Sequence, residues 1–176
     1  MQPKLLMTEA QMDQELERVA KEIIAAGTDD IALVGIRTRG VPIAEWLGRK
    51  LEKLQGKPTE LGVLDINLYR DDLSEVDVQP VVKPTELPFK LDGKGIILVD
   101  DVLYTGRTIR AAMDALIDYG RPRFIRLMVM VDRGWREFPI QADYIAKKID
   151  TAANENVKVM LQAMDETNQV VIKTMS

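Results

Sequence analysis

The chain has 176 residues, of which 46% are hydrophobic and 30% are charged, and its net charge is -4 at pH 7. This length supports one well-filled core, and the composition is neither that of a disordered chain nor that of a membrane-spanning protein. Cysteine and histidine do not occur, which excludes disulfides, thiolate nucleophiles, histidine-based triads and zinc sites built from these residues. Any metal is therefore expected to be a hard cation such as magnesium, held by carboxylate and substrate oxygens.

The N-terminal residues carry no apolar stretch of signal-peptide length before Thr8, so a cytoplasmic location and no membrane partner are expected. The negative net charge argues against broad, non-specific binding to nucleic acid. Any RNA contact is therefore expected to be specific.

Residues 8–27 have the pattern of an amphipathic helix. Thr8 and Gln11 fit a capping box, and Met12, Leu16 and Val19 recur at helical spacing until Gly27. The apolar run 31–36 predicts a buried strand, and the basic turn 37–40 after it is compatible with phosphate binding. Pro42 then stands in the first turn of a second predicted helix, whose apolar side is formed by Ile43, Ala44, Leu47, Leu51 and Leu54.

Alternating residues over 63–69 predict another strand. The polar, proline-interrupted stretch 70–88 is too long for an ordinary connection and predicts a loop that closes over a substrate. A strand is predicted over 95–100 and another over 124–131. Between them lies a helix face ended by Gly120 and Pro122 and formed by Ile109, Ala112, Met113, Leu116 and Ile117.

Strands that alternate with helices predict the α/β class, with a doubly wound, mostly parallel sheet flanked by helices in a single domain over 1–176. Ligands of such sheets bind at the carboxyl ends of the strands. The segments 157–164 and 170–173, joined by a polar turn at 165–168, predict a C-terminal β-hairpin beside the main sheet.

The chemistry concentrates in residues 96–108, where an apolar strand leads into Asp100 and Asp101 and then into a turn before a helix. The two carboxylates can accept hydrogen bonds from vicinal hydroxyls. Thr105 and Thr108 offer hydroxyl donors, Gly106 permits close approach of the backbone, and the start of the helix attracts an anion. This order of groups fits a phosphorylated ribose.

The same segment resembles the phosphoribosyl-diphosphate motif of type I phosphoribosyltransferases. Similarity to the PyrR family, pyrimidine-operon attenuation regulators that are also uracil phosphoribosyltransferases, extends over 34–40, 64–72, 97–122 and 131–137. The resemblance implies the type I fold with a covering loop at about 70–88 and a small hood at about 132–155. It implies catalytic roles for Arg39, Arg70, Asp100 and Asp101, and substrate binding by Thr38, Gly40, Tyr69, Val102, Leu103, Tyr104, Thr105, Gly106, Arg107, Thr108, Val131, Asp132, Arg133, Tyr144 and Ile145.

Within this set, the resemblance assigns the 5-phosphate to residues 105–108, the ribose hydroxyls to the aspartate pair, the diphosphate to 38–40 and the base to 131–133, with 144–145 nearby. The implied reaction joins uracil to phosphoribosyl diphosphate and yields UMP and diphosphate. The implied cofactor is Mg²⁺, bound through substrate oxygens with Asp100 and Asp101 as candidate ligands.

The family role also implies a specific mRNA leader as a partner, regulation by uridine nucleotides, and a homodimer or homotetramer. Candidate RNA-contacting residues are Arg18, Lys21, Arg136 and Lys147, with Lys148 beside them. The sequence departs from the family pattern in this region. Trp135 replaces the usual histidine, Gln141 replaces an arginine, and 150–155 lacks the pattern Pro-Thr-Ser-Arg-Ser-Glu.

Several alternatives stay open on the sequence. The enzyme without an RNA function and an RNA-binding nucleotide sensor with little catalysis both fit. A purine phosphoribosyltransferase also fits, because no residue identifies the base unambiguously. Locally, the paired aspartates could cap a turn, 37–40 could be an ordinary basic turn, and the charges at 70–72 and on the RNA candidates could be solvated surface. Trp135 could be a packed anchor or an exposed stacking platform.

Overall fold

Five parallel strands form the central sheet of the computed structural model, which describes residues 2–27, 29–71 and 83–175. Their order across the sheet is β3-β2-β4-β5-β6. The neighbouring strands β2 and β4 are therefore not consecutive in the chain, and the chain leaves them in different directions. The bounds are Ile31–Ile36 for β2, Glu60–Leu64 for β3, Gly95–Leu103 for β4, Phe124–Asp132 for β5 and Tyr144–Lys148 for β6.

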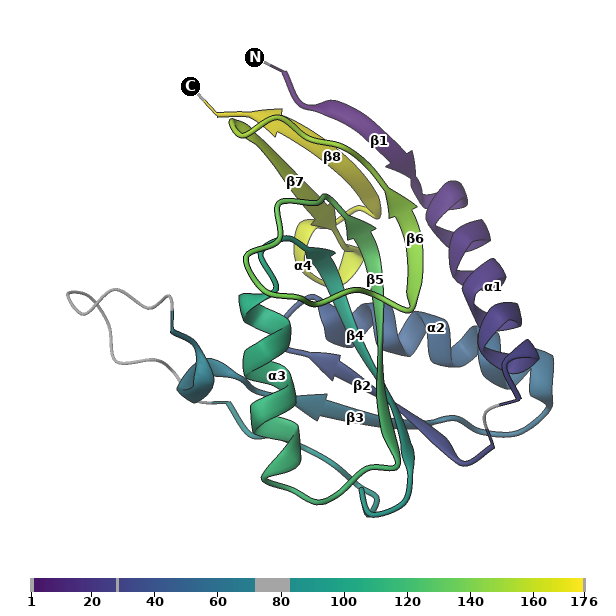
Figure 1. The fold of residues 1–176 in the computed structure, drawn as a ribbon. Coiled ribbons are helices and arrows are strands. Elements are labelled where there is room, and N and C mark those ends of the chain that lie inside the picture. Colours follow the sequence, from purple (N-terminus) through teal and green to yellow (C-terminus); the bar gives the residue numbers. More distant parts are fainter. Residues whose placement is uncertain (1, 28, 72–82, 176) are drawn as a thin grey trace.

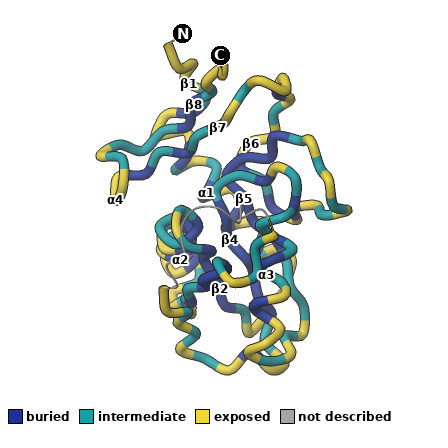
Figure 2. The backbone as a smooth tube through the Cα atoms, turned by 90° about the vertical axis from the view of Figure 1, so that its left-hand side faces the viewer, coloured by how far each residue is buried: buried dark blue, intermediate teal, exposed yellow. Residues whose placement is uncertain are grey.

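Helices cover both faces of this sheet, as predicted. Helices α1 (Glu9–Ala25) and α2 (Gly40–Gln55) pack on one face, and α3 (Arg107–Ile117) packs on the other. In Figure 2 the buried strands run between α2 and α3. Apolar residues of the strands alternate between the two faces, so the sheet separates two hydrophobic cores. Among the described residues, no helix is long and apolar enough to cross a membrane.

A second, three-stranded antiparallel sheet, here called the tail sheet, joins the two ends of the chain (Figure 1). Its order is β1 (Lys4–Thr8), β8 (Gln169–Thr174) and β7 (Glu155–Met160). The predicted C-terminal hairpin is confirmed by β7 and β8, but its first strand ends at Met160, and the short helix α4 (Gln162–Asp165) follows. The strands β1 and β6 were not predicted.

The predicted helices and most strands are confirmed, including the capping box of Thr8 and Gln11 at the start of α1. The strand predicted over 63–69 is wrong beyond Leu64, because a 3₁₀ turn occupies Asn67–Tyr69. The Asp65 carboxylate accepts a hydrogen bond from the backbone N–H of Asn67 at 2.9 Å and holds that turn. Strand β4 continues past the predicted end at Asp100 to Leu103. Leu54 and Ile117, predicted for apolar helix faces, are exposed.

Candidate functional site

The loops that follow β2 and β4 meet at the carboxyl edge of the sheet. Residues 37–40 connect β2 to α2, and the peptide bond between Arg37 and Thr38 is cis. This segment is here called the diphosphate loop, after the ligand that the resemblance predicts for it. A Cβ atom on Gly40 would lie 2.2 Å from the carbonyl oxygen of Val99. The loop therefore contacts the backbone of β4 directly, at a position where only glycine fits. Because the chain turns to opposite faces of the sheet after β2 and β4, this edge is where ligands of doubly wound sheets bind.

A cavity of about 320 Å³ opens beside the end of β4. Its wall includes the phosphate turn, defined here as residues 104–108. Gly106 caps the N-terminus of α3 with a positive φ of 93°, and the Thr105 hydroxyl accepts a hydrogen bond from the backbone N–H of Arg107 at 3.2 Å. The lining residues are Arg70, Val102, Leu103, Tyr104, Thr105, Gly106, Arg107, Thr108, Ile109 and Glu137. The predicted residues Arg70 and 102–108 thus surround one cavity.

The two adjacent aspartates are held at the end of the buried part of β4. Asp100 is 6% exposed, and its carboxylate accepts a hydrogen bond from the N–H of Asp101 at 2.9 Å. The carboxylate of Asp101 in turn accepts from the N–H of Val102 at 2.8 Å. Burial raises the pKa of Asp100 well above its ordinary value, and the neighbouring charge of Asp101 raises it further. Burial also raises the pKa of Asp101, an effect that its hydrogen bonds and Arg39 oppose.

The start of the predicted covering loop is anchored to α3. The carbonyl oxygen of Tyr69 accepts a hydrogen bond from Arg110 at 3.0 Å, and the Tyr69 hydroxyl donates to Asp118. Arg107 forms ion pairs with Asp71 at 2.7 Å and with Glu137 at 2.6 Å. Tyr69, predicted to bind substrate, therefore lies over α3, whereas Arg70 reaches the cavity wall. Residues 72–82 of the predicted loop lie outside the described residues.

The segment predicted to lie near the base is largely buried. Val131 is inaccessible, and Asp132 is 3% exposed and forms an ion pair with Arg136 at 2.6 Å. Arg133 is 5% exposed and donates to the carbonyl of Glu155 at 2.7 Å. The side chains of Asp132 and Arg133 thus already hold the segment after β5 together.

The structure does not bring Tyr144 and Ile145 to this edge. They begin β6 and pair with Met128 and Val129, in the middle of β5. Tyr144 is 7% exposed and packs in the core, where its hydroxyl accepts a hydrogen bond from Arg126. The residue of β6 level with Asp132 is Lys148.

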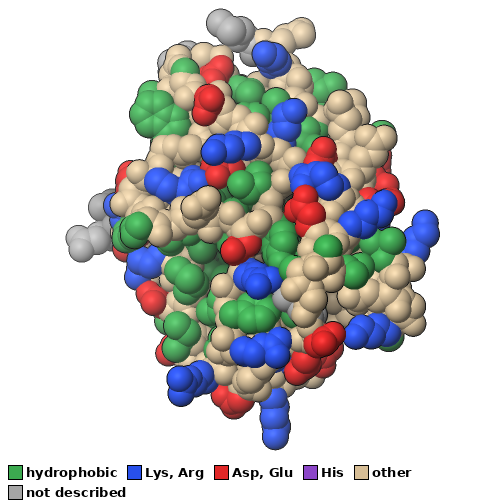
Figure 3. All heavy atoms as spheres, turned by 45° about the vertical axis from the view of Figure 1, so that its right-hand side comes forward, with side chains coloured by type: hydrophobic (Ala, Val, Ile, Leu, Met, Phe, Trp, Pro, Cys, Tyr) green, Lys and Arg blue, Asp and Glu red, His purple; other side chains and the backbone are tan. Residues whose placement is uncertain are grey.

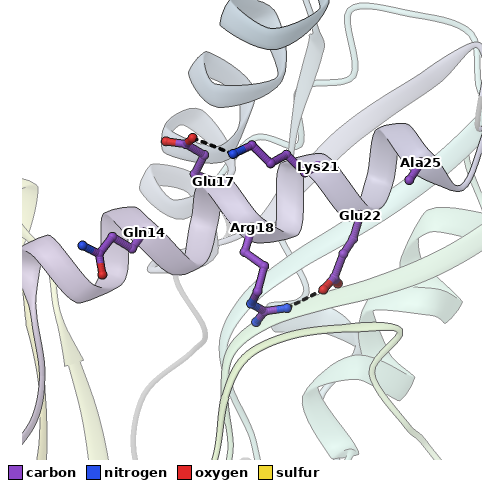
Figure 4. Close-up of a pocket in the computed structure, with 6 residues that line it drawn as sticks. All are labelled: Gln14, Glu17, Arg18, Lys21, Glu22 and Ala25. Atoms are coloured by element: carbon purple, nitrogen blue, oxygen red, sulfur yellow. Dashed lines mark hydrogen bonds and ion pairs between the residues drawn. The ribbon is translucent and has the colours of Figure 1, made fainter.

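The four RNA candidates have different surroundings. In Figure 4, Lys21 is paired with Glu17 and Arg18 with Glu22 along α1, in a hollow of about 530 Å³ away from the carboxyl edge. Arg18 also donates to the carbonyl of Ile145 at 2.7 Å. Lys and Arg side chains alternate with Asp and Glu over the face in Figure 3, without one continuous basic patch. Arg136 is bound to Asp132, whereas Lys147 is exposed on the edge strand β6.

Trp135 combines the two alternatives left open by the sequence. Its indole N–H donates to the carbonyl of Thr151 at 2.8 Å, yet the side chain leaves the residue 52% exposed. The structure also adds residues that the sequence did not point to. Glu137 lines the cavity, and Asp165 of α4 binds Arg39 of the diphosphate loop. Glu137 ends the segment 131–137 that resembles the family but was not predicted as a site residue, and Asp165 lies in no recognisable motif. Both come to the site through folding.

Comparisons with known proteins agree with this architecture. The family model of the phosphoribosyl transferase domain matches residues 6–163. The chain is 54% identical to the bifunctional protein PyrR of Thermus aquaticus, over 94% of this chain and 92% of the relative. It is 52% identical to the PyrR protein of Pelotomaculum thermopropionicum, over 90% and 89% of the two chains.

Solved structures share the fold at low sequence identity. Hypoxanthine phosphoribosyltransferase of Trypanosoma cruzi superposes with a TM-score of 0.73 at 18% identity, covering 98% of this chain and 97% of that one. The Staphylococcus aureus enzyme superposes with a TM-score of 0.71 at 17% identity, covering 98% and 92%. On its matched domain, its fold and its identity to relatives over nearly the whole length, the chain belongs to the phosphoribosyl transferase domain family and, within it, to the PyrR proteins.

Proposed function

We propose that this protein is a uracil phosphoribosyltransferase that converts uracil and phosphoribosyl diphosphate to UMP and diphosphate. The observation that carries the proposal is that the phosphate turn, at the N-terminus of α3, lines a cavity beside the end of β4, the strand that holds the buried Asp100 and the half-buried Asp101. An anion in the cavity meets the positive end of the α3 helix dipole and the Thr105 and Thr108 hydroxyls. The two carboxylates lie near the end of β4, just before the phosphate turn, and accept hydrogen bonds from the ribose hydroxyls.

The substrate is oriented so that the bond between ribose C1 and the diphosphate oxygen breaks as uracil N1 forms its bond to C1. Uracil gives up its N1 proton in this step, so that the products are UMP, diphosphate and one proton. The developing negative charge on the diphosphate is met by Arg39 from the diphosphate loop and Arg70 from the covering loop. The ribose passes through a state with oxocarbenium character, and no protein nucleophile is required. The covering loop keeps out water that would otherwise attack the activated sugar.

The carboxyl edge fits a magnesium ion held mainly by the substrate. Among the described residues, no group of three or more carboxylates could enclose a metal ion. Asp100 and Asp101 supply hard oxygen donors beside the sugar site, and Mg²⁺ usually binds through one or two carboxylates together with phosphate oxygens. When bound, Mg²⁺ would neutralise charge on the diphosphate leaving group.

The direct test is diphosphate release from phosphoribosyl diphosphate and Mg²⁺, with uracil, cytosine, orotate, hypoxanthine and guanine compared in parallel. We expect release with uracil alone. Release with hypoxanthine or guanine instead would assign a purine phosphoribosyltransferase, and no release with any base would leave a nucleotide sensor as the better description.

A second, regulatory role is supported by the relatives, which are named bifunctional PyrR proteins. We propose that the chain also binds a specific mRNA leader in a manner that depends on uridine nucleotides, as a cytoplasmic homodimer or homotetramer. Lys147 is the RNA candidate whose side chain forms no hydrogen bond or ion pair within the described part of the chain.

The RNA proposal is tested by filter binding of the leader of a pyrimidine operon with and without UMP. Lys147→Gln should weaken binding and reduce the steepness of its salt dependence. Lys53→Gln, an equal change of charge near the C-terminus of α2, is the matched control and should leave binding unchanged. Equal affinity for the leader and for a scrambled RNA would refute the regulatory role and leave the enzyme intact.

A further inference from the structure

The side chain of Arg39 is held by β7 of the tail sheet and by the short helix α4 that follows β7. Arg39 belongs to the diphosphate loop and immediately precedes α2. Its guanidinium donates through Nη1 to the carbonyl of Val159 at 2.9 Å and to Oδ2 of Asp165, and through Nη2 to Oδ1 of Asp165 at 3.2 Å. This two-point contact fixes both the position and the plane of the guanidinium. It joins residues separated by 126 positions in the chain.

Asp165 is itself fixed and nearly buried. Its side chain is 9% exposed, its carboxylate accepts a hydrogen bond from the N–H of Leu161 at 3.0 Å, and it forms an ion pair with Lys158 at 2.9 Å. Arg39 and these partners hold the pKa of Asp165 far below its ordinary value, so the carboxylate stays charged throughout the neutral range. Figure 1 shows α4 at the lower end of the tail sheet, and Figure 2 shows it on the same side of the central strands as α2.

The contacts leave part of Arg39 available to a ligand. A guanidinium has five N–H groups, and the described contacts to Val159 and Asp165 use three of them. The Nε–H and one Nη2–H remain. The residue after Arg39, Gly40, packs against β4 at the start of the aspartate pair, where an added Cβ would lie 3.3 Å from Cα of Asp100. The charge of Arg39 also lowers the pKa of Asp101. A flexible arginine in this position would lose rotamer entropy on binding a ligand, and a clamped one loses less.

We propose that Asp165 is a positioning residue for the reaction, which clamps Arg39 so that its remaining N–H groups face the diphosphate of the substrate. This inference rests on the proposed function. It gives the tail sheet a part in catalysis, because β7 and α4 supply both contacts to Arg39. Asp165 touches no reacting atom and acts through Arg39 alone.

The test measures diphosphate binding directly, by calorimetry with Mg²⁺ present, together with KM for phosphoribosyl diphosphate. Asp165→Asn keeps the shape of the side chain but removes its charge. We expect it to weaken diphosphate binding and raise this KM by about 10-fold, the size of one charge-assisted hydrogen bond. Binding of UMP, which lacks the diphosphate, should change less than about twofold.

A double-mutant cycle separates positioning from a general structural effect. In the Arg39→Ala background, Asp165→Asn should have almost no further effect on diphosphate binding, since its route of action is gone. The matched control is Lys158→Met, which removes the other ion pair of Asp165 and leaves Arg39 bound to it. We expect this variant to bind diphosphate as the wild type does, although its melting temperature falls.

Each alternative outcome overturns the inference. An equal effect of Asp165→Asn with and without Arg39 would show that Asp165 acts on the fold as a whole. Tighter diphosphate binding in Asp165→Asn would show that the carboxylate competes with the substrate for Arg39. Failure of the proposed function is a distinct result, because it appears in the wild type as diphosphate binding without diphosphate release for any base.

Discussion

The guanidinium of Arg133 lies 4.1 Å from the centre of the Tyr104 ring. Tyr104 belongs to the phosphate turn and Arg133 follows β5, so the stacked pair joins the two segments proposed to hold the phosphate and the base. Arg133 is buried and also bound to Thr151 and Glu155. A desolvated cation on an aromatic face contributes up to about 2 kcal/mol.

Tyr104→Ala should therefore lower the free energy of unfolding by about 1–2 kcal/mol, because Arg133 loses its aromatic partner. Tyr104→Phe retains the ring and should unfold within about 0.5 kcal/mol of the wild type. Urea unfolding of the three proteins checks both values. Equal destabilisation by the two variants would mean that the Tyr104 hydroxyl, and not its ring face, contributes this unfolding free energy.

Asp100→Asn should raise stability at neutral pH while reducing diphosphate release by at least about 10-fold. The folded-state pKa of Asp100 lies above its unfolded value, so folding favours the protonated form. The stability that this group contributes is greatest at low pH and falls as pH rises from the ordinary carboxylate range through the raised folded pKa. A residue that cannot ionise avoids this loss.

Thermal unfolding at pH 5 and pH 8 measures the effect, and the gain in melting temperature should be larger at pH 8. Asp114→Asn, which alters an exposed carboxylate of α3 that pairs with Arg110 at 2.7 Å, is the control and should show little dependence on pH. A lower melting temperature for Asp100→Asn at pH 8 would contradict the assigned direction of the pKa shift.

The acid side of the activity profile should reflect the same pair. The two aspartates accept from the ribose hydroxyls most strongly when they are ionised, and burial raises the pKa of both. The value of kcat/KM for phosphoribosyl diphosphate should therefore begin to fall at a pH above the ordinary carboxylate range. In Asp101→Asn, the residual activity should fall at a lower pH than in the wild type, because the Asp101 charge that raises the pKa of Asp100 is gone. An unchanged acid side of the profile in that variant would exclude the aspartate pair as its origin.

Gly106→Ala should damage both stability and substrate binding. Gly106 has a φ of 93°, and an added Cβ would lie 3.2 Å from Cβ of Phe138. We expect a loss of about 1–2 kcal/mol in unfolding free energy and a raised KM for phosphoribosyl diphosphate. Gly93→Ala is a matched control, because its φ is 73° and nothing lies within 4 Å of the added atom. It should lose comparable stability yet keep the wild-type KM, and a raised KM there would attribute the effect of Gly106→Ala to backbone strain alone.

Sequence patterns predicted the elements whose signals are local. The capping box at Thr8, the apolar runs of β2 and β4, and the helical spacing of α1 each depend on residues close together in the chain. The alternating arrangement of these elements predicts the parallel sheet, and a parallel sheet brings the ends of β2 and β4 to one edge. The phosphate turn and the aspartate pair could be proposed as one site for this reason.

Tertiary structure decided the features that depend on partners distant in sequence. Strands β1 and β6 are five-residue elements at sheet edges, stabilised by hydrogen bonds to β8 and β5 and not by a long periodic pattern of their own. The resemblance predicted that Tyr144 lies near the base, but its pairing with Met128 of β5 places it in the core. Arg39 and Asp165 meet only because the tail sheet packs above the diphosphate loop. No sequence pattern predicts this ion pair, because it depends on how α4 is placed relative to the diphosphate loop.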